Sequence, residues 1–342
     1  MFKKSFRSLL STTLTVCLLG SVGIGGFSQT PQRPANQTPR PAQPVNDQGA
    51  EKIFTRRVQL PITVTDKKGQ LVPGLTRHDF LILEDKVPQT IDGFDTEMTN
   101  KLPLYIAVLM DTSASTAGKL KFEQESAMNF VQTVVRPRKD RVLFATFDEE
   151  IKLRQDFTDK LDLLDRAVFG VKHPGQYTAL YDAVWQFCDE KMRSVQGRRA
   201  MVVITDGGDT YSKADLNDAI DIAQRTETTI FAISTKAGFA GTVPGVEAGT
   251  VKDQKDKDLA KLCEETGGTA FFTGDMLALE RSFTKISKEL RSQYMITYKS
   301  TNETYDGSYR RIDVKLTNGQ DKLKLRTKRG YKAISDSVSA PR

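Results

Sequence analysis

Cysteine, histidine and tryptophan are scarce in this chain of 342 residues, which contains three, two and one of them respectively. The three cysteines, Cys17, Cys188 and Cys263, exclude a disulfide-dense scaffold and a four-cysteine zinc site. The two histidines, His78 and His173, argue against histidine-rich metal chemistry and weaken any catalytic scheme that needs a histidine base.

What the chain does contain is ordinary for a soluble globular protein. Hydrophobic residues make up 38% of it and charged residues 27%, which is enough apolar material for a core and excludes disorder of the whole chain. The length predicts one large domain or two. The formal net charge of +7 is small for this length, so it gives no indication of nucleic-acid binding, and we expect no nucleic-acid partner.

The first 28 residues resemble a secretory signal peptide. An apolar run over 9–24 carries no charge and ends shortly before the small residues of a plausible cleavage site. A retained membrane anchor and lipidation at Cys17 are the alternatives, but the run is short for a span, so we expect no stable membrane span in the mature chain. The protein is thus expected to be exported, to the periplasm, the cell envelope or the medium. The basic residues before the run are Lys3, Lys4 and Arg7.

Proline is concentrated in the segment that follows. Five of the thirteen prolines lie within 29–52, which has almost no large apolar side chain. Such a segment does not bury enough surface to offset the entropy of ordering it. We expect a disordered linker.

Both ends of the remaining chain have the pattern of β-strands. Apolar residues alternate with polar ones at 58–64 and again at 312–316, the period of a half-buried strand. Asn318-Gly319 predicts a hairpin turn, with Leu323 and Leu325 on its second arm. The two β-rich ends form either one small β-sandwich or two separate appendages.

Between these ends the pattern is that of an α/β domain. Continuous apolar runs without alternation are typical of strands buried on both faces, and they alternate here with segments of helical spacing. This order predicts a doubly wound, mostly parallel, Rossmann-like sheet. The runs are 104–110, 142–147, 201–204 and 229–233, and the helical segments are 120–135, 180–192, 216–223, 259–265 and 276–290.

Oxygen-bearing side chains follow the predicted strands at their carboxyl ends, where open α/β sheets bind ligands. Asp111, Ser113 and Ser115 come directly after the first run, Thr178 precedes a helix, and Asp206 follows the third run. Hydroxyls and carboxylates without histidine or thiol suit a hard cation such as Mg²⁺ or Mn²⁺. Taken alone, the Asp-x-Ser-x-Ser segment is also compatible with a turn or a helix cap.

In this order and spacing, these five residues resemble the metal-ion-dependent adhesion site (MIDAS) of von Willebrand factor A-type (VWA) domains. Segments flanking the α/β region further resemble a bacterial secreted VWA-related subfamily, in particular 64–66, 74–76, 79–80, 84–85, 309–312 and 329–331. The resemblance implies a VWA fold for the α/β region, and the β-rich ends that bracket it are expected to form a small flanking β-sandwich. The expected organisation is a signal peptide at 1–28, a linker at 29–52, flanking β-strands at 53–100, a VWA domain at 101–292, further flanking strands at 293–333 and a tail at 334–342.

The resemblance also implies roles for the site residues. Ser113 and Ser115 would bind the metal directly, Thr178 directly or through water, and Asp111 and Asp206 mostly through water. A neutral hydroxyl shell leaves Mg²⁺ poorly neutralised, so an acidic side chain of a partner protein is the expected sixth ligand. The expected function is protein binding, of an adhesion or scaffold type and without catalysis.

Two other classes of function remain open at this stage. The metal could only stabilise a structural envelope protein, or the site could belong to a Mg²⁺-dependent hydrolase or phosphoryl-transfer enzyme. The chain has no nucleophile-elbow motif and no phosphate-binding glycine-rich loop, which disfavours catalysis. If the site binds a partner, the loop at 235–254 is expected to select it.

Overall fold

The computed structural model describes residues 57–96, 99, 102–172, 174–206, 208–236, 253–272, 276–317 and 322–334. The predicted signal peptide and linker lie outside these residues, as does most of the loop at 235–254. No helix within the described ranges is long and apolar enough to cross a membrane.

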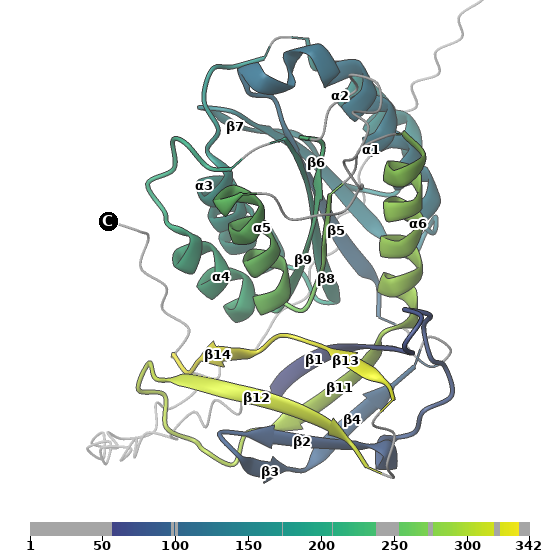
Figure 1. The fold of residues 1–342 in the computed structure, drawn as a ribbon, viewed down its shortest axis with the longest axis vertical. Helices are drawn as coiled ribbons and strands as arrows, with labels where there is room; N and C mark the ends of the chain where they lie inside the picture. Colours follow the sequence, from purple (N-terminus) through teal and green to yellow (C-terminus); the bar gives the residue numbers. More distant parts are fainter. Residues whose placement is uncertain are drawn as a thin grey trace, which may run out of the picture. The chain divides into compact units, whose positions relative to one another are not determined.

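A mostly parallel sheet lies at the centre of the α/β region (Figure 1). Within the described residues its strand order is β10-β9-β8-β5-β6-β7, and only β7 runs antiparallel to its neighbour. The middle strands are apolar because both of their faces are buried. The expected doubly wound α/β fold class is confirmed. The strands are β5 (Leu104–Asp111), β6 (Arg141–Phe147), β7 (Ile151–Thr158), β8 (Arg198–Thr205), β9 (Thr228–Ser234) and β10 (Ala270–Phe272).

Helices cover both faces of this sheet, and each face has its own apolar core. Helices α1, α2 and α6 lie on one face, and α3, α4 and α5 lie on the other (Figure 1). Cys188 and Cys263 are both buried as free thiols. The helices are α1 (Leu120–Val134), α2 (Leu161–Phe169), α3 (Leu180–Phe187, continued by a π-helical turn at Cys188–Met192), α4 (Leu216–Arg225), α5 (Gln254–Glu265) and α6 (Met276–Ser292).

Three elements of this region are not predicted by the sequence. Strand β7 is an edge strand with mostly exposed or half-exposed side chains, and register shifts interrupt its pairing with β6. Irregular pairing of this kind removes the strict alternation by which an edge strand is recognised. Helix α2 has nine residues, and β10 has only three, too few to show a clear period.

The β-rich ends of the described chain form two antiparallel four-stranded sheets, with strand orders β13-β1-β11-β4 and β14-β12-β2-β3. Each sheet combines strands from both ends, and their apolar side chains form one shared core. The ends therefore build a single β-sandwich, not two separate appendages. Its strands are β1 (Arg57–Thr65), β2 (Phe80–Glu84), β3 (Val87–Gln89), β4 (Ile91–Asp95), β11 (Tyr294–Lys299), β12 (Tyr309–Leu316), β13 (Lys324–Arg326) and β14 (Gly330–Lys332).

The hairpin predicted at Asn318-Gly319 is wrong in its pairing. Strand β12 pairs with β14 over Tyr309–Arg311 and with β2 over Ile312–Leu316, and not with β13. Strand β13 pairs instead with β1, beside Thr63–Thr65 and in the other sheet. The two residues of the expected turn lie outside the described part of the chain.

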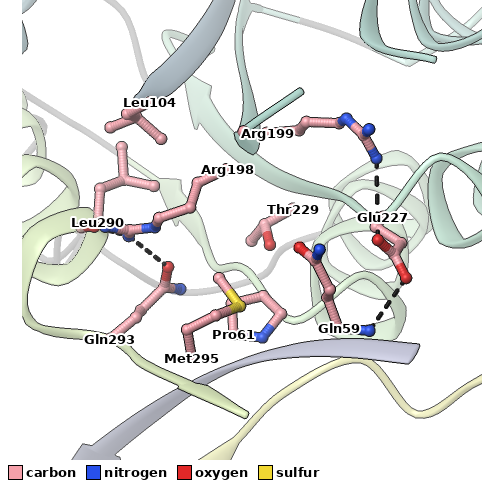
Figure 2. Close-up of a pocket in the computed structure, with 11 residues that line it drawn as sticks. Gln59, Pro61, Leu104, Arg198, Arg199, Glu227, Thr229, Leu290, Gln293 and Met295 are labelled. Carbon is pink, nitrogen blue, oxygen red and sulfur yellow. Dashed lines mark hydrogen bonds and ion pairs between the residues drawn. The ribbon is translucent and has the colours of Figure 1, made fainter. Parts of the chain in front are cut away.

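The sandwich contacts the α/β region at the amino ends of β5 and β8. Arg198, at the start of β8, donates to the carbonyl of Leu290 and, over 3.2 Å, to Oε1 of Gln293 (Figure 2). The backbone N–H of Gln59 in β1 donates to Oε1 of Glu227 over 3.0 Å. A cavity of about 10 Å³ remains among these residues, room for no more than one water molecule. This contact leaves the opposite, carboxyl edge of the sheet for the site described below.

A buried ion pair lies inside the sandwich. Nη1 of Arg310 in β12 is 3.4 Å from Oε1 of Glu84 in β2, and both side chains are almost completely buried. The Glu84 carboxylate also accepts from the hydroxyls of Tyr298 at 2.7 Å and Tyr331 at 3.0 Å. Burial, together with this carboxylate, raises the pKa of Tyr331 to about 12. The network therefore joins strands from both ends of the chain inside the core.

Arg310→Met should lower the free energy of unfolding by about 3–5 kcal/mol, because it leaves the Glu84 carboxylate buried without its cation. The matched control is Arg311→Met, which removes the neighbouring, exposed arginine. Urea unfolding followed by circular dichroism measures both. A loss for Arg310→Met no larger than that for Arg311→Met would show that the buried pair does not hold the sandwich together.

Candidate metal-binding site

The candidate site lies where the sheet topology reverses direction. From β5 the chain continues outward to β6 and β7, and it then returns to β8 on the other side of β5. Strands β5 and β8 pair in parallel up to Met110 and Ile204. Asp111 is the last residue of β5 and Asp206 directly follows β8, so the two aspartates lie at neighbouring strand ends. Ligands of open α/β sheets bind at such a switch point, outside the carboxyl ends of the strands.

Hydrogen bonds to short polar side chains form the turn that follows β5. Oδ1 of Asp111 accepts from the backbone N–H of Ser113 at 2.9 Å, and Oγ1 of Thr116 donates to the Ser113 carbonyl at 2.9 Å. Asp, Ser and Thr favour such turns because their side chains bond to the nearby backbone. A 3-10 turn at Ala114–Lys119 then leads into α1. In this turn Oγ of Ser113 and Oγ of Ser115 lie 3.1 Å apart.

The end of β8 is joined to this turn by side-chain hydrogen bonds. Oγ of Ser115 donates to Oδ1 of Asp206 over 2.7 Å, and Oγ1 of Thr205 donates to Oδ2 of Asp111 over 2.6 Å. Nζ of Lys119 lies 3.2 Å from Oδ2 of Asp206. Four of the five predicted site residues are therefore connected by direct hydrogen bonds.

Thr178, the fifth, belongs to a loop that is anchored beside the others. Its carbonyl accepts from the backbone N–H groups of Thr210, at 2.9 Å, and Tyr211, at 3.1 Å. Three residues before Thr178, the N–H of Gly175 donates to the carbonyl of Thr112 over 2.7 Å, which ties the loop to the turn after β5. Within the described contacts, no hydrogen bond joins Thr178 directly to the two serines.

The donor set fits a hard divalent cation. Bonds of about 2.1 Å place neighbouring ligands of an octahedral Mg²⁺ about 3.0 Å apart. The Oγ atoms of Ser113 and Ser115 have close to this spacing, at 3.1 Å. Ser113 and Asp206 are buried while Ser115 is exposed, so the cluster opens to the surface. Across the described residues, no group of three or more His, Cys, Asp or Glu side chains is placed to hold a metal. A metal bound at this cluster would therefore need the serine hydroxyls among its ligands.

Burial disfavours negative charge beneath the cluster. Desolvation raises the pKa of Asp111 to about 6, although hydrogen bonds from Thr205 and Ser113 oppose the shift. Desolvation also raises the pKa of Glu123 in α1 to about 8, and the charges of Asp111 and Asp206 add to this shift. Glu123 is held by a 2.7 Å hydrogen bond from Oγ1 of Thr235. The site therefore contains two carboxyl groups that a nearby cation would favour in their ionised form.

Lys119, Glu123 and Thr205 are part of this site but were not predicted. Lys119 and Glu123 lie around the start of the helix that follows the motif. Charged residues there are usually exposed to solvent, so the sequence offers no reason to assign these two to the site. Thr205 is the last residue of an apolar strand, and nothing in the sequence pattern indicates that its hydroxyl bonds to Asp111. The expected role of the loop at 235–254 falls largely outside the described residues and stays a prediction.

Comparisons with known proteins give structural likenesses only. No family model and no curated protein matches the chain. The vWF domain of the type V pili tip protein Mfa5 from Porphyromonas gingivalis is 14% identical, with a TM-score of 0.43, and the match covers 55% of this chain and 95% of that one. BatB from Bacteroides thetaiotaomicron is 14% identical, with a TM-score of 0.40, over 55% of this chain and all 100% of that one.

The PilB minor pilin from Streptococcus sanguinis is also similar. It is 13% identical with a TM-score of 0.42, and the match covers 59% of this chain but only 63% of the pilin. Because all three scores are below 0.5, nothing about the function of this chain follows from these likenesses.

Replacing Glu123 by Gln should stabilise the fold more as the pH rises. A carboxyl group whose pKa rises from 4.5 to about 8 on folding costs stability progressively as the pH increases through that window, and the amide does not ionise. In EDTA, the melting temperature of Glu123→Gln minus that of wild type should therefore grow between pH 5 and pH 9. Each kcal/mol of destabilisation that the substitution removes should raise the melting temperature by roughly 2–4 °C.

The matched control is Glu125→Gln, which removes a half-exposed carboxylate from the same helix. Its melting difference from wild type should change little over the same pH range. A flat difference for Glu123→Gln as well would show that the buried carboxyl does not ionise at a cost to the fold.

Proposed function

We propose that this protein is an exported, Mg²⁺-dependent protein-binding module of the VWA type, with Asp111, Ser113, Ser115, Thr178 and Asp206 as its MIDAS. The observation that carries the proposal is the hydrogen-bonded cluster of two serine hydroxyls and Asp206 at the switch point of the sheet. Export is supported by the signal-like leader at 1–28.

The hydroxyls and the carboxylates of the cluster would contribute differently to binding the ion. Ser113 and Ser115 supply neutral oxygens, while Asp111 and Asp206 place negative charge behind them. Mg²⁺ or Mn²⁺ would supply a centre that attracts an anionic oxygen from outside. Because the hydroxyls do not neutralise its charge, an Asp or Glu side chain of a partner protein is the ligand that best completes the site.

The openness of the site favours recognition over a purely structural metal. Structural metal sites are closed by protein ligands, whereas Ser115 is exposed and the cluster reaches the surface. A hydrolase or phosphoryl-transfer enzyme would need a positioned nucleophile or base in addition to the metal. We assign no such role to the residues of the cluster.

Two stacked tyrosines beside the site would extend the contact with a partner. Tyr177 and Tyr211 are each about half exposed, and their ring centroids are 5.1 Å apart with nearly parallel planes. Tyr177 precedes Thr178, and the N–H of Tyr211 donates to the Thr178 carbonyl. Exposed tyrosines are frequent energetic hot spots of protein interfaces, so these two are suited to surround a metal-bound acid.

Mg²⁺ or Mn²⁺ should bind the purified protein and raise its melting temperature relative to EDTA. A ligand at about 100 times its dissociation constant adds about 2.7 kcal/mol to the stability of the protein that binds it. Ser113→Ala and Asp206→Ala should lose both the heat of binding in calorimetry and the melting shift.

Thr133→Ala is the matched control for this experiment, since it removes an exposed hydroxyl from α1. It should behave as wild type. No metal binding by wild-type protein, or equal binding by Ser113→Ala and Asp206→Ala, would refute the proposed site.

Tyr211→Ala should weaken Mg²⁺-dependent capture of a partner from the organism's envelope fraction several-fold, because it removes half of the stacked pair. Metal affinity and melting temperature should stay at their wild-type values. Tyr309→Ala, which removes an exposed tyrosine of the sandwich, is the control and should capture normally. Unchanged capture by Tyr211→Ala would exclude the tyrosine pair from the interface.

A further inference from the structure

The ammonium group of Lys119 lies against Asp206, one of the residues of the proposed metal site. Its Nζ lies 3.2 Å from Oδ2 of Asp206 and donates to the carbonyl of Thr235 over 3.0 Å. The Lys119 side chain is only 19% exposed. A partly buried ammonium with two oxygen acceptors is held beside the Asp206 carboxylate, unlike a lysine that extends into solvent.

Because of this contact, the Lys119 ammonium would compete with a divalent ion for the Asp206 carboxylate. Asp206 uses Oδ1 for Ser115 and Oδ2 for Lys119, so both of its oxygens are engaged. A divalent ion at the serines would be repelled by the ammonium and would compete with it for the same carboxylate. Removing that positive charge would therefore favour the divalent ion.

Glu123 offers the ammonium a second acceptor. It lies four residues after Lys119, a spacing at which side chains meet on a helix, and α1 begins between them at Leu120. Its Oε1 accepts from Thr235, whereas its buried Oε2 has no hydrogen-bond partner among the described residues. Thr235 thus contacts both groups, through its carbonyl to Lys119 and through its hydroxyl to Glu123.

We propose that Lys119 is a tethered counter-cation of the metal site: its ammonium holds the Asp206 carboxylate until a divalent ion binds, and it then moves onto Oε2 of Glu123. This inference rests on the proposed function, and it adds an internal control of metal affinity to it. The lysine sets a threshold concentration of the divalent ion, while Glu123 makes the exchange possible by accepting the displaced charge.

Calorimetric titration of the full-length exported chain with Mn²⁺ tests the first half of the proposal. Lys119→Met should bind Mn²⁺ tighter than wild type by about tenfold or more, because the competing charge is gone. Lys119→Arg keeps the charge and should stay within about threefold of wild type. Lys121→Met, which removes a fully exposed lysine two residues away, is the matched control and should leave the affinity unchanged.

A double-mutant cycle with Glu123→Gln tests the second half. In the wild-type background Glu123→Gln should weaken Mn²⁺ binding several-fold, because the displaced ammonium loses its anionic acceptor. In the Lys119→Met background the same change should have no effect. An equal loss in both backgrounds would overturn the exchange, since Glu123 would then act on the ion directly.

The outcomes separate this inference from the proposed function. Binding of Mn²⁺ by wild type with no gain in Lys119→Met would overturn the role of the lysine and leave the metal site standing. Binding by Lys119→Met alone would support the inference in its strongest form, with the lysine excluding the ion from the wild-type site. No binding by any variant would refute the metal site itself.

Discussion

Pairing of β11 with two strands from the other end of the chain is the constraint on which the rest of the structure depends. Strand β11 pairs with β1 on one side and with β4 on the other. In the β4 pairing Asp95 faces Met295, so the points at which the chain leaves and re-enters the sandwich are neighbours. The whole α/β region is thus a closed insertion between two adjacent strands. Closing so long a loop costs entropy, which the shared apolar core of the sandwich must offset.

This closure fixes which edge of the parallel sheet contacts the sandwich. Helix α6 ends at Ser292 and β11 begins at Tyr294, so the last helix leads directly into the sandwich. Its carbonyl at Leu290 accepts from Arg198, which lies at the amino end of β8. The amino ends of the strands are therefore covered by the seam in Figure 2, whereas Asp111 and Asp206 follow the carboxyl ends at the opposite edge. Attachment and candidate recognition use different edges of the same sheet.

Much of this architecture was predictable because its signals are local. Apolar runs such as 104–110 specify strands buried on both faces, and polar residues placed directly after them specify the edge at which a site forms. The partner of β13 was not predictable, because a sequence pattern indicates a strand but not which strand it pairs with, and β13 pairs with β1 from the other end of the chain. The contact of Lys119 with Asp206 was not predictable either, because the two residues follow different strands and come together only in the folded sheet.

Both aspartates of the candidate site have hydrogen-bond partners within the chain. Asp111 accepts from Thr205 and from the backbone of Ser113, and Asp206 accepts from Ser115 and Lys119. Buried carboxylates that are hydrogen-bonded in this way do not require a metal for the fold to form. A divalent ion bound at the candidate site would therefore add to the stability of the fold without being required for it.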